Sequence, residues 1–112
     1  MKKLLVTGGF GKIGKHFVQQ YDHKYEITVA DVLTNEGSFT DGVRIEKADL
    51  TDATVCRKLC EGMDTIIHLA GLVDLSEADE VLNTNIRITQ HIFKAAVKAG
   101  CRRLIFASSA QT

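Results

Sequence analysis

Short apolar runs alternate along the chain with longer segments of helical periodicity. The runs predict strands at residues 4–6, 26–31, 43–48, 64–70 and 102–107. Apolar residues three and four apart predict helices from Lys12 to about Gln20, from the capping residues 49–52 to about Glu61, and up to Ala99. The last of these helices begins at a capping box, residues 76–79, and the polar segment 32–42 predicts a loop.

This alternation of strands and helices predicts the fold class. Right-handed crossovers between successive strands build a parallel sheet with helices on its faces. We therefore predict an α/β, Rossmann-type, doubly wound parallel sheet with strand order 3-2-1-4-5, and a cofactor across the switch point between strands one and four. With 112 residues, no internal repeat and no linker, the chain is predicted to form one domain, residues 1–112.

Two of the predicted helices have an apolar face. In the first helix we expect Ile13, Phe17 and Val18 to point inward. The expected inward stripe of the long helix consists of Ala78, Val81, Leu82, Ile88, Ile92, Phe93 and Ala96. Asn85 lies inside this stripe, where a buried amide without a partner costs about 1–3 kcal/mol. The residues alone leave open whether Asn85 bonds a neighbouring backbone carbonyl or has a functional role.

A glycine-rich turn, Thr7–Gly14, joins the first strand to the first helix. Its glycines satisfy two spacings, G-x-G-x-x-G from Gly9 and G-x-x-G-x-x-G from Gly8. Such a turn at a helix N-terminus lets a phosphate approach backbone N–H groups, although a glycine turn without a ligand is the simpler alternative. A magnesium-binding P-loop is excluded, because the lysine of this turn is followed by Ile13 and not by Ser or Thr.

Asp31 ends the second predicted strand, where dinucleotide-binding proteins place an acidic residue. Its carboxylate can accept hydrogen bonds from both hydroxyls of an adenosine ribose. A 2′-phosphate there would meet a like charge, and Val32 and Leu33 supply no arginine for it. We therefore predict that NAD is the cofactor and that NADP is less favoured, although Lys12 or Lys15 could still accommodate the phosphate.

Composition limits the partners and the compartment. The 14 basic and 14 acidic residues balance, so nucleic acid and anionic membranes are not expected as main partners, and no stretch is long enough to span a membrane. The cysteine count is three, and Cys56 and Cys60 are one helical turn apart without further ligands at metal-binding spacing. We predict no metal site, reduced thiols and a cytoplasmic location.

Three further features have ordinary structural explanations. His68 ends a buried strand and is expected to be a hydrogen-bonded core residue. One face of the long helix is basic and is expected to be solvated; it consists of Arg87, His91, Lys94 and Lys98. Ser108 and Ser109 follow the fifth strand at its carboxyl end, where ligands bind in parallel sheets, but serine is common there.

Taken together, these stretches resemble the extended short-chain dehydrogenase/reductase family, the NAD-dependent epimerases and dehydratases of nucleotide sugars. The resemblance covers essentially the whole chain and rests on five ordered motifs. They are Thr7–Gly14 with Asp31, Ala48–Leu50, His68–Gly71, Asn83–Asn85 and Phe106–Ala110.

The resemblance implies a role for each matching residue. The pyrophosphate would be held by Gly8, Gly11 and Gly14 and by the backbone from Phe10 through Lys12 to Ile13, and the adenosine ribose by Asp31. Adenine would contact Asp49 and Leu50, and the nicotinamide side would be lined by Leu69, Ala70 and Gly71. Asn85 would organise the active-site helix and its water, and Ser109 would be the catalytic serine that hydrogen-bonds the substrate.

The chain departs from the family pattern in one respect. The family's acid/base tyrosine, in Tyr-x-x-x-Lys, is expected after the serine strand, and the sequence ends at Thr112 before it. The resemblance thus implies the cofactor-binding half of an enzyme that moves hydride to and from a sugar or nucleotide sugar, and a possible homodimer. The alternative is a non-catalytic NAD(P)-binding sensor or regulatory module of the same fold.

Overall fold

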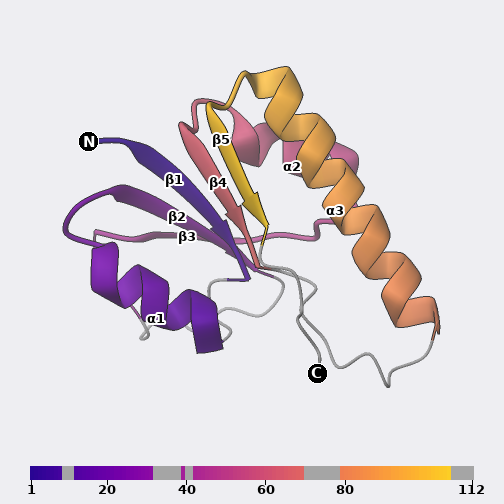
Figure 1. Ribbon diagram of the computed structural model, residues 1–112, viewed down its shortest axis with the longest axis horizontal. Coiled ribbons are helices and arrows are strands. Elements are labelled where there is room, and N and C mark those ends of the chain that lie inside the picture. Colours follow the sequence, from indigo (N-terminus) through magenta and orange to yellow (C-terminus); the bar gives the residue numbers. More distant parts are fainter. Residues whose placement is uncertain (9–11, 32–38, 40–41, 70–78, 107–112) are drawn as a thin grey trace.

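The computed structural model describes residues 1–8, 12–31, 39, 42–69 and 79–106, with the backbone alone for Lys12 and residues 79–85 (Figure 1). The elements in chain order are β1 (Lys3–Thr7), α1 (Lys12–Tyr21), β2 (Glu26–Asp31), β3 (Arg44–Lys47), α2 (Ala53–Cys60), β4 (Thr65–His68), α3 (Asp79–Ala99) and β5 (Arg103–Phe106). Every predicted strand and helix is present, and their boundaries within the described residues differ from the prediction by a few residues. The predicted capping box at residues 76–79 lies largely outside the described residues.

The five strands form one sheet in the order β3-β2-β1-β4-β5, and every pair is parallel. The predicted strand order is therefore confirmed. Thr7 at the end of β1 lies opposite Ala30 of β2 on one side and His68 of β4 on the other. The strand order reverses at this point, so the ends of β1 and β4 form the switch point of the sheet.

Helices cover both faces of the sheet, with α1 on one face and α2 and α3 on the other (Figure 1). Alternate residues of β1 point to opposite faces, so Leu5 packs beneath α2 and α3 and Val6 packs on the side of α1. On the first side the core includes Cys56 and Cys60 of α2 and Ile92, Ala95 and Ala96 of α3. On the second side it includes Val18, Ile27, Val29, Ile67 and Leu69.

The predicted ends of α2 are confirmed in detail. Asp52 precedes the helix in an extended conformation, and its carboxylate accepts hydrogen bonds from the N–H groups of Thr54 and Val55. The chain then leaves the helix through Gly62, whose φ of 76° lies in the left-handed region that favours glycine.

Two residues that the helical periodicity placed in the core are exposed. Ile13 is 60% exposed, because the buried face of α1 runs through Gly14 and Val18 and Ile13 lies beside it at the first turn. Phe93 is 52% exposed, because α3 buries the neighbouring positions Ile92 and Ala96 instead. The predictions for Ile13 and Phe93 were therefore wrong.

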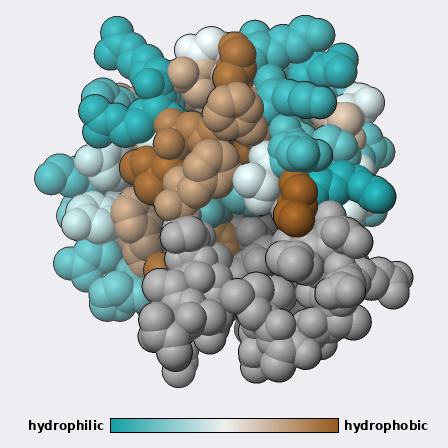
Figure 2. All heavy atoms as spheres, turned by 45° about the vertical axis from the view of Figure 1, so that its right-hand side comes forward, coloured by the Kyte–Doolittle hydropathy of each residue, from teal (hydrophilic) through white to brown (hydrophobic). Residues whose placement is uncertain are grey.

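The predicted strand order places the fifth strand at one edge of the sheet, and the structure has it there. β5 is the last strand of the sheet, and Ile105 and Phe106 are 44% and 40% exposed. Figure 2 brings the α3 side of the molecule forward and shows hydrophobic surface among hydrophilic residues there. Among the described side chains of α3, the exposed large hydrophobic residues are Ile86, Phe93 and Val97.

Candidate functional site

The glycine turn leaves β1 at the switch point of the sheet. Gly8 follows the last residue of β1, and its φ is 72°, a conformation that L side chains rarely adopt. Its N–H donates to the carbonyl of Ala30 at 3.0 Å, which extends the pairing of β1 with β2 by one residue. Gly14 is buried in the first turn of α1, and Ile13 beside it is exposed.

Asp31 lies at the same edge of the sheet as Gly8. It is the last residue of β2 and is half-buried, and it directly follows Ala30, which binds the N–H of Gly8. The carbonyl of Asp31 accepts a hydrogen bond from the N–H of Ala48 at 2.9 Å, just after β3. Three of the predicted cofactor residues, Gly8, Asp31 and Asp49, therefore lie at or just after the ends of the neighbouring strands β1, β2 and β3, at one edge of the sheet.

Asp49 is exposed and held in a tight turn. Its Oδ1 accepts hydrogen bonds from the Thr51 hydroxyl at 2.6 Å and from the Thr51 N–H at 3.0 Å. The hydroxyl bond first, and then the backbone bond, lower the pKa of the Asp49 carboxyl below its usual value. The carboxylate is thus ionised at neutral pH and oriented as a hydrogen-bond acceptor.

Leu50 is anchored from the interior. Its side chain is only 5% exposed and packs in the core beneath α2 and α3. Its carbonyl oxygen accepts hydrogen bonds from Nδ1 of His91 on α3 and from the Cys56 thiol on α2, each at 3.2 Å. The contact of Leu50 with adenine remains a prediction.

Thr7 is a residue of the switch point that sequence reasoning missed. Its hydroxyl lies 2.6 Å from Nδ1 of His68 and accepts from the N–H of Leu69 at 3.1 Å, while its carbonyl accepts from the same N–H at 3.0 Å. Leu69, a predicted nicotinamide neighbour, is thereby fixed to the end of β1. The signal lies in the register that pairs Thr7 with His68, which is visible only once the strand order is known.

His68 is buried and hydrogen-bonded, as expected for a core residue. It is 3% exposed, its Nε2 lies 3.2 Å from the Thr89 hydroxyl of α3, and the Phe106 ring stands edge-on to it at 5.7 Å. Burial lowers the pKa of the imidazole from 6.5 to about 4. The imidazole is therefore neutral near pH 7.

The other predicted site residues lie outside what the structure describes. These residues are Phe10, Gly11, Ala70, Gly71 and Ser109. Lys12 and Asn85 fall within α1 and α3, but their side chains are not described. In the described ranges, no three His, Cys, Asp or Glu side chains are grouped as a metal would need, and no helix has the length and apolar character to cross a membrane.

Comparison with known proteins shows the family to which the chain belongs. The model of the NAD dependent epimerase/dehydratase family matches residues 4–112. The chain belongs to this family. The resemblance predicted from the glycine turn and the later motifs is confirmed.

Individual members of the NAD dependent epimerase/dehydratase family show what the chain is similar to. It is 33% identical over 110 residues to uronate dehydrogenase of Pseudomonas syringae pv. tomato, and the match covers 96% of this chain and 39% of that protein. A mutant uronate dehydrogenase from Agrobacterium tumefaciens, complexed with NAD, superposes with a TM-score of 0.84 at 29% identity, covering 96% of this chain and 41% of that one. A UDP-N-acetylglucosamine 4-epimerase from Methanobrevibacter ruminantium M1 superposes with a TM-score of 0.85 at 28% identity, covering 97% and 38%.

The chain is shorter than the relatives that it matches. It spans about two fifths of the length of the relatives that it matches. The three relatives described above are named as uronate dehydrogenases and as a UDP-N-acetylglucosamine 4-epimerase, and the family is described as NAD dependent.

Proposed function

We propose that this chain binds NAD along the edge formed by Gly8, Asp31 and Asp49. Bound there, NAD would supply the hydride acceptor or donor of the reaction. The glycine turn Gly8–Gly14 would hold the pyrophosphate, through Gly8, Gly11, Gly14 and the backbone of Phe10, Lys12 and Ile13. Asp31 would accept hydrogen bonds from the adenosine ribose, and Asp49 from the exocyclic amine of adenine.

The observation that carries this proposal is the contact between Gly8 and Ala30. The bond from the Gly8 N–H to the Ala30 carbonyl, at 3.0 Å, brings the start of the glycine turn beside the residue that precedes Asp31. A phosphate site and a ribose site must be neighbours if one dinucleotide is to occupy both. The positive φ of Gly8 supports the same conclusion, because a side chain at this position would strain the turn.

We propose further that the whole protein transfers hydride reversibly between NAD and a carbon of a sugar or nucleotide sugar, as a dehydrogenase, epimerase or dehydratase. The uronate dehydrogenases and nucleotide-sugar epimerases among its relatives support this substrate class. Leu69, Ala70 and Gly71 would line the nicotinamide side, and the bonds that fix the Leu69 N–H to Thr7 support a rigid wall there. Asn85 would position the active-site helix, and Ser109 would hydrogen-bond the reacting hydroxyl or carbonyl.

The choice of NAD over NADP, a cytoplasmic location and a homodimer belong to the same proposal. The cofactor preference rests on the carboxylate of Asp31, which would repel a 2′-phosphate. The location rests on the three free cysteines, two of them buried. The dimer rests on family resemblance.

Cofactor binding is tested by replacing Asp31 and a matched carboxylate at the other end of the same strand. Asp31→Asn should weaken NADH binding by about tenfold, because hydrogen bonds to a charged group contribute ~1.5–3 kcal/mol. Glu26→Gln removes an exposed carboxylate at the start of β2 and should leave affinity unchanged. Binding is followed by NADH fluorescence, and equal affinities for the two variants would remove Asp31 from the site.

The catalytic part of the proposal needs a separate experiment. The intact protein is incubated with NAD and a panel of uronic acids and nucleotide sugars, and NADH absorbance and the sugar products are followed. Ser109→Ala should lower turnover by at least about a hundredfold, the lower end for a lost catalytic hydrogen bond, while NADH binding is retained. NADH binding without turnover of any sugar would favour the regulatory alternative.

A further inference from the structure

A groove between α2 and α3 is lined mainly by basic side chains. Its volume is about 290 Å³, and the lining consists of Arg57 from α2, His91, Lys94 and Lys98 from α3, and the small residues Ala53 and Ala95. No acidic residue is part of this lining. The groove lies outside the cofactor edge described above.

The packing of the two helices brings these charges together. Cys56 and Cys60 of α2 and Ile92 and Ala96 of α3 belong to one buried cluster, which fixes the helices side by side. On α3, the positions of His91, Lys94 and Lys98 are three and four residues apart and therefore share one face. Burying the apolar faces thus carries the basic face of α3 against Arg57.

These cations lack acidic partners within the described part of the chain. Neither Arg57, Lys94 nor Lys98 forms an ion pair or a side-chain hydrogen bond there. Asp52, at the start of α2, directs its carboxylate to the N–H groups of Thr54 and Val55. Like charges three or four residues apart repel each other by a few tenths of a kcal/mol, which a bound anion would offset.

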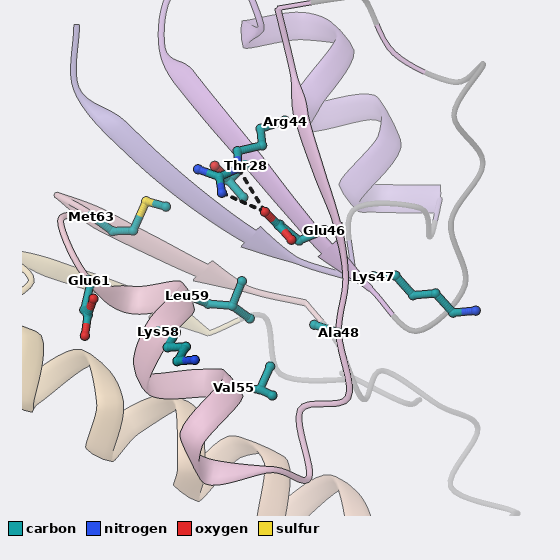
Figure 3. A pocket seen from close by; sticks show the side chains of 10 residues that line it. All are labelled: Thr28, Arg44, Glu46, Lys47, Ala48, Val55, Lys58, Leu59, Glu61 and Met63. Atoms are coloured by element: carbon teal, nitrogen blue, oxygen red, sulfur yellow. Dashed lines mark hydrogen bonds and ion pairs between the residues drawn. The ribbon is translucent and has the colours of Figure 1, made fainter.

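A neighbouring cavity differs from this groove in the charges of its lining. The cavity between β3 and the other side of α2 also receives basic side chains, but it holds acidic ones as well (Figure 3). There Arg44 and Glu46 point toward each other, with both guanidinium contacts at 2.9 Å. In that cavity two carboxylates offset part of the positive charge, whereas the groove between α2 and α3 has no carboxylate in its lining.

The basic face of α3 that the sequence predicted to be solvated includes one residue, His91, that is not fully exposed. His91 is half-buried, and its Nδ1 donates to the carbonyl of Leu50 at 3.2 Å. This bond fixes the ring at the side of the groove. The charged side chains of the groove, Arg57, Lys94 and Lys98, are exposed and open to an anion from solvent.

We propose that the groove between α2 and α3 is a binding site for a small anion that carries one or two phosphate groups. The Arg57 guanidinium offers a planar fork for two phosphate oxygens, and Lys94 and Lys98 add compact positive charges. A volume of about 290 Å³ is at the lower limit of ligand pockets, which suits a small phosphate compound and not a dinucleotide.

The test is a titration of the intact protein with inorganic pyrophosphate at constant ionic strength, followed by backbone amide NMR shifts. Saturable shifts are expected at Arg57, His91 and Lys94. Arg57→Gln and Lys94→Gln should each raise the dissociation constant about tenfold, as expected for loss of a charge-assisted contact. The matched control is Lys58→Gln, which removes the next charge along α2, in the other cavity, and should change the constant less than twofold.

Three outcomes would overturn the proposal. The first is no saturable shift at any pyrophosphate concentration in the millimolar range. The second is equal weakening by Arg57→Gln and Lys58→Gln, which would mean attraction to net charge alone. The third is a set of shifts confined to the glycine turn near Gly8, which would assign pyrophosphate to the cofactor edge and leave the groove empty.

Discussion

The hydroxyl of Thr7 lies 2.6 Å from Nδ1 of His68, inside the core at the switch point of the sheet. This hydroxyl accepts the N–H of Leu69, and a hydroxyl can at the same time donate its own proton to Nδ1. The arrangement favours the imidazole tautomer that carries its proton on Nε2 and donates it to Thr89 at 3.2 Å. One neutral histidine thus connects β1, β4 and α3 next to the proposed nicotinamide wall.

Replacing Thr7 tests the contribution of this connection. Thr7→Val keeps the shape but leaves Nδ1 of the buried His68 without this partner, so the free energy of unfolding should fall by about 1–3 kcal/mol. Urea denaturation measures the loss. The control is Thr28→Val, at a buried position of β2 whose hydroxyl makes no hydrogen bond to the described residues, and it should change stability by less than about 0.5 kcal/mol. Similar losses in both variants would show that the Thr7 hydroxyl adds nothing specific.

His68 should also make stability depend on pH. Its pKa is lowered by burial from 6.5 in the unfolded chain to about 4 in the folded protein, so between these values only the unfolded chain takes up the proton. The contribution of neutral His68 to the free energy of unfolding is complete above about pH 6.5 and is lost as pH falls toward 4. At ~1.4 kcal/mol per pH unit, the loss amounts to about 3 kcal/mol. Unfolding free energies measured from pH 7 to 4 should show this slope, and His68→Gln should remove it. An unchanged slope in the variant would assign the effect to other groups.

Much of the fold was predictable because local signals agree with each other. Leu4–Val6 and Ile66–Leu69 are apolar runs of strand length, and the glycine turn specifies a strand before it and a helix after it. The crossover rule then leaves few strand orders, and the observed order is the expected one. The predicted burial of Ile13 and Phe93 was wrong because periodicity identifies the apolar side of a helix but not which part of that side the neighbouring elements cover.

The candidate site could be predicted from local motifs and from family resemblance. Gly8 was predicted from the glycine spacing, Asp31 from its place at the end of a predicted strand, and Asp49 from the resemblance alone. Thr7 has no chemical signal of its own, and its role appears only through its register with His68. The bond from His91 to Leu50 and the approach of Arg57 to Lys94 depend on how α2 packs against α3, which no pattern within one helix specifies.

Asp52 should contribute measurably to the stability of α2. Its carboxylate satisfies two N–H groups of the first turn, at 2.9 Å and 3.4 Å, so Asp52→Ala should cost about 0.5–2 kcal/mol. Asp52→Ser keeps a capping oxygen and should recover most of this loss. Thermal unfolding of the two variants measures the difference, and equal destabilisation would mean that capping is not the cause.

The three cysteines should differ in reactivity. Burial raises the pKa of the Cys60 thiol to about 12 and, with the nearby charges of Asp52 and Asp49, that of Cys56 to about 11. Both thiols are inaccessible, whereas Cys101 is half-buried and burial raises its pKa as well. At pH 8 a thiol of pKa 11 is ionised to only about one part in a thousand, so alkylation of Cys56 and Cys60 should require opening of the core.

Peptide mapping after treatment with iodoacetamide at pH 8 tests this order. In native buffer we expect modification of Cys101 first, with Cys56 and Cys60 protected. In urea above the unfolding midpoint all three should react at similar rates, because the burial that separates them is gone. Cys101→Ser provides the control, since it should make the native protein almost inert to the reagent while leaving the urea reaction of the other two unchanged. Native labelling of Cys56 at the rate of Cys101 would show that the α2–α3 core opens readily, and the fixed groove between these helices would then lose its structural basis.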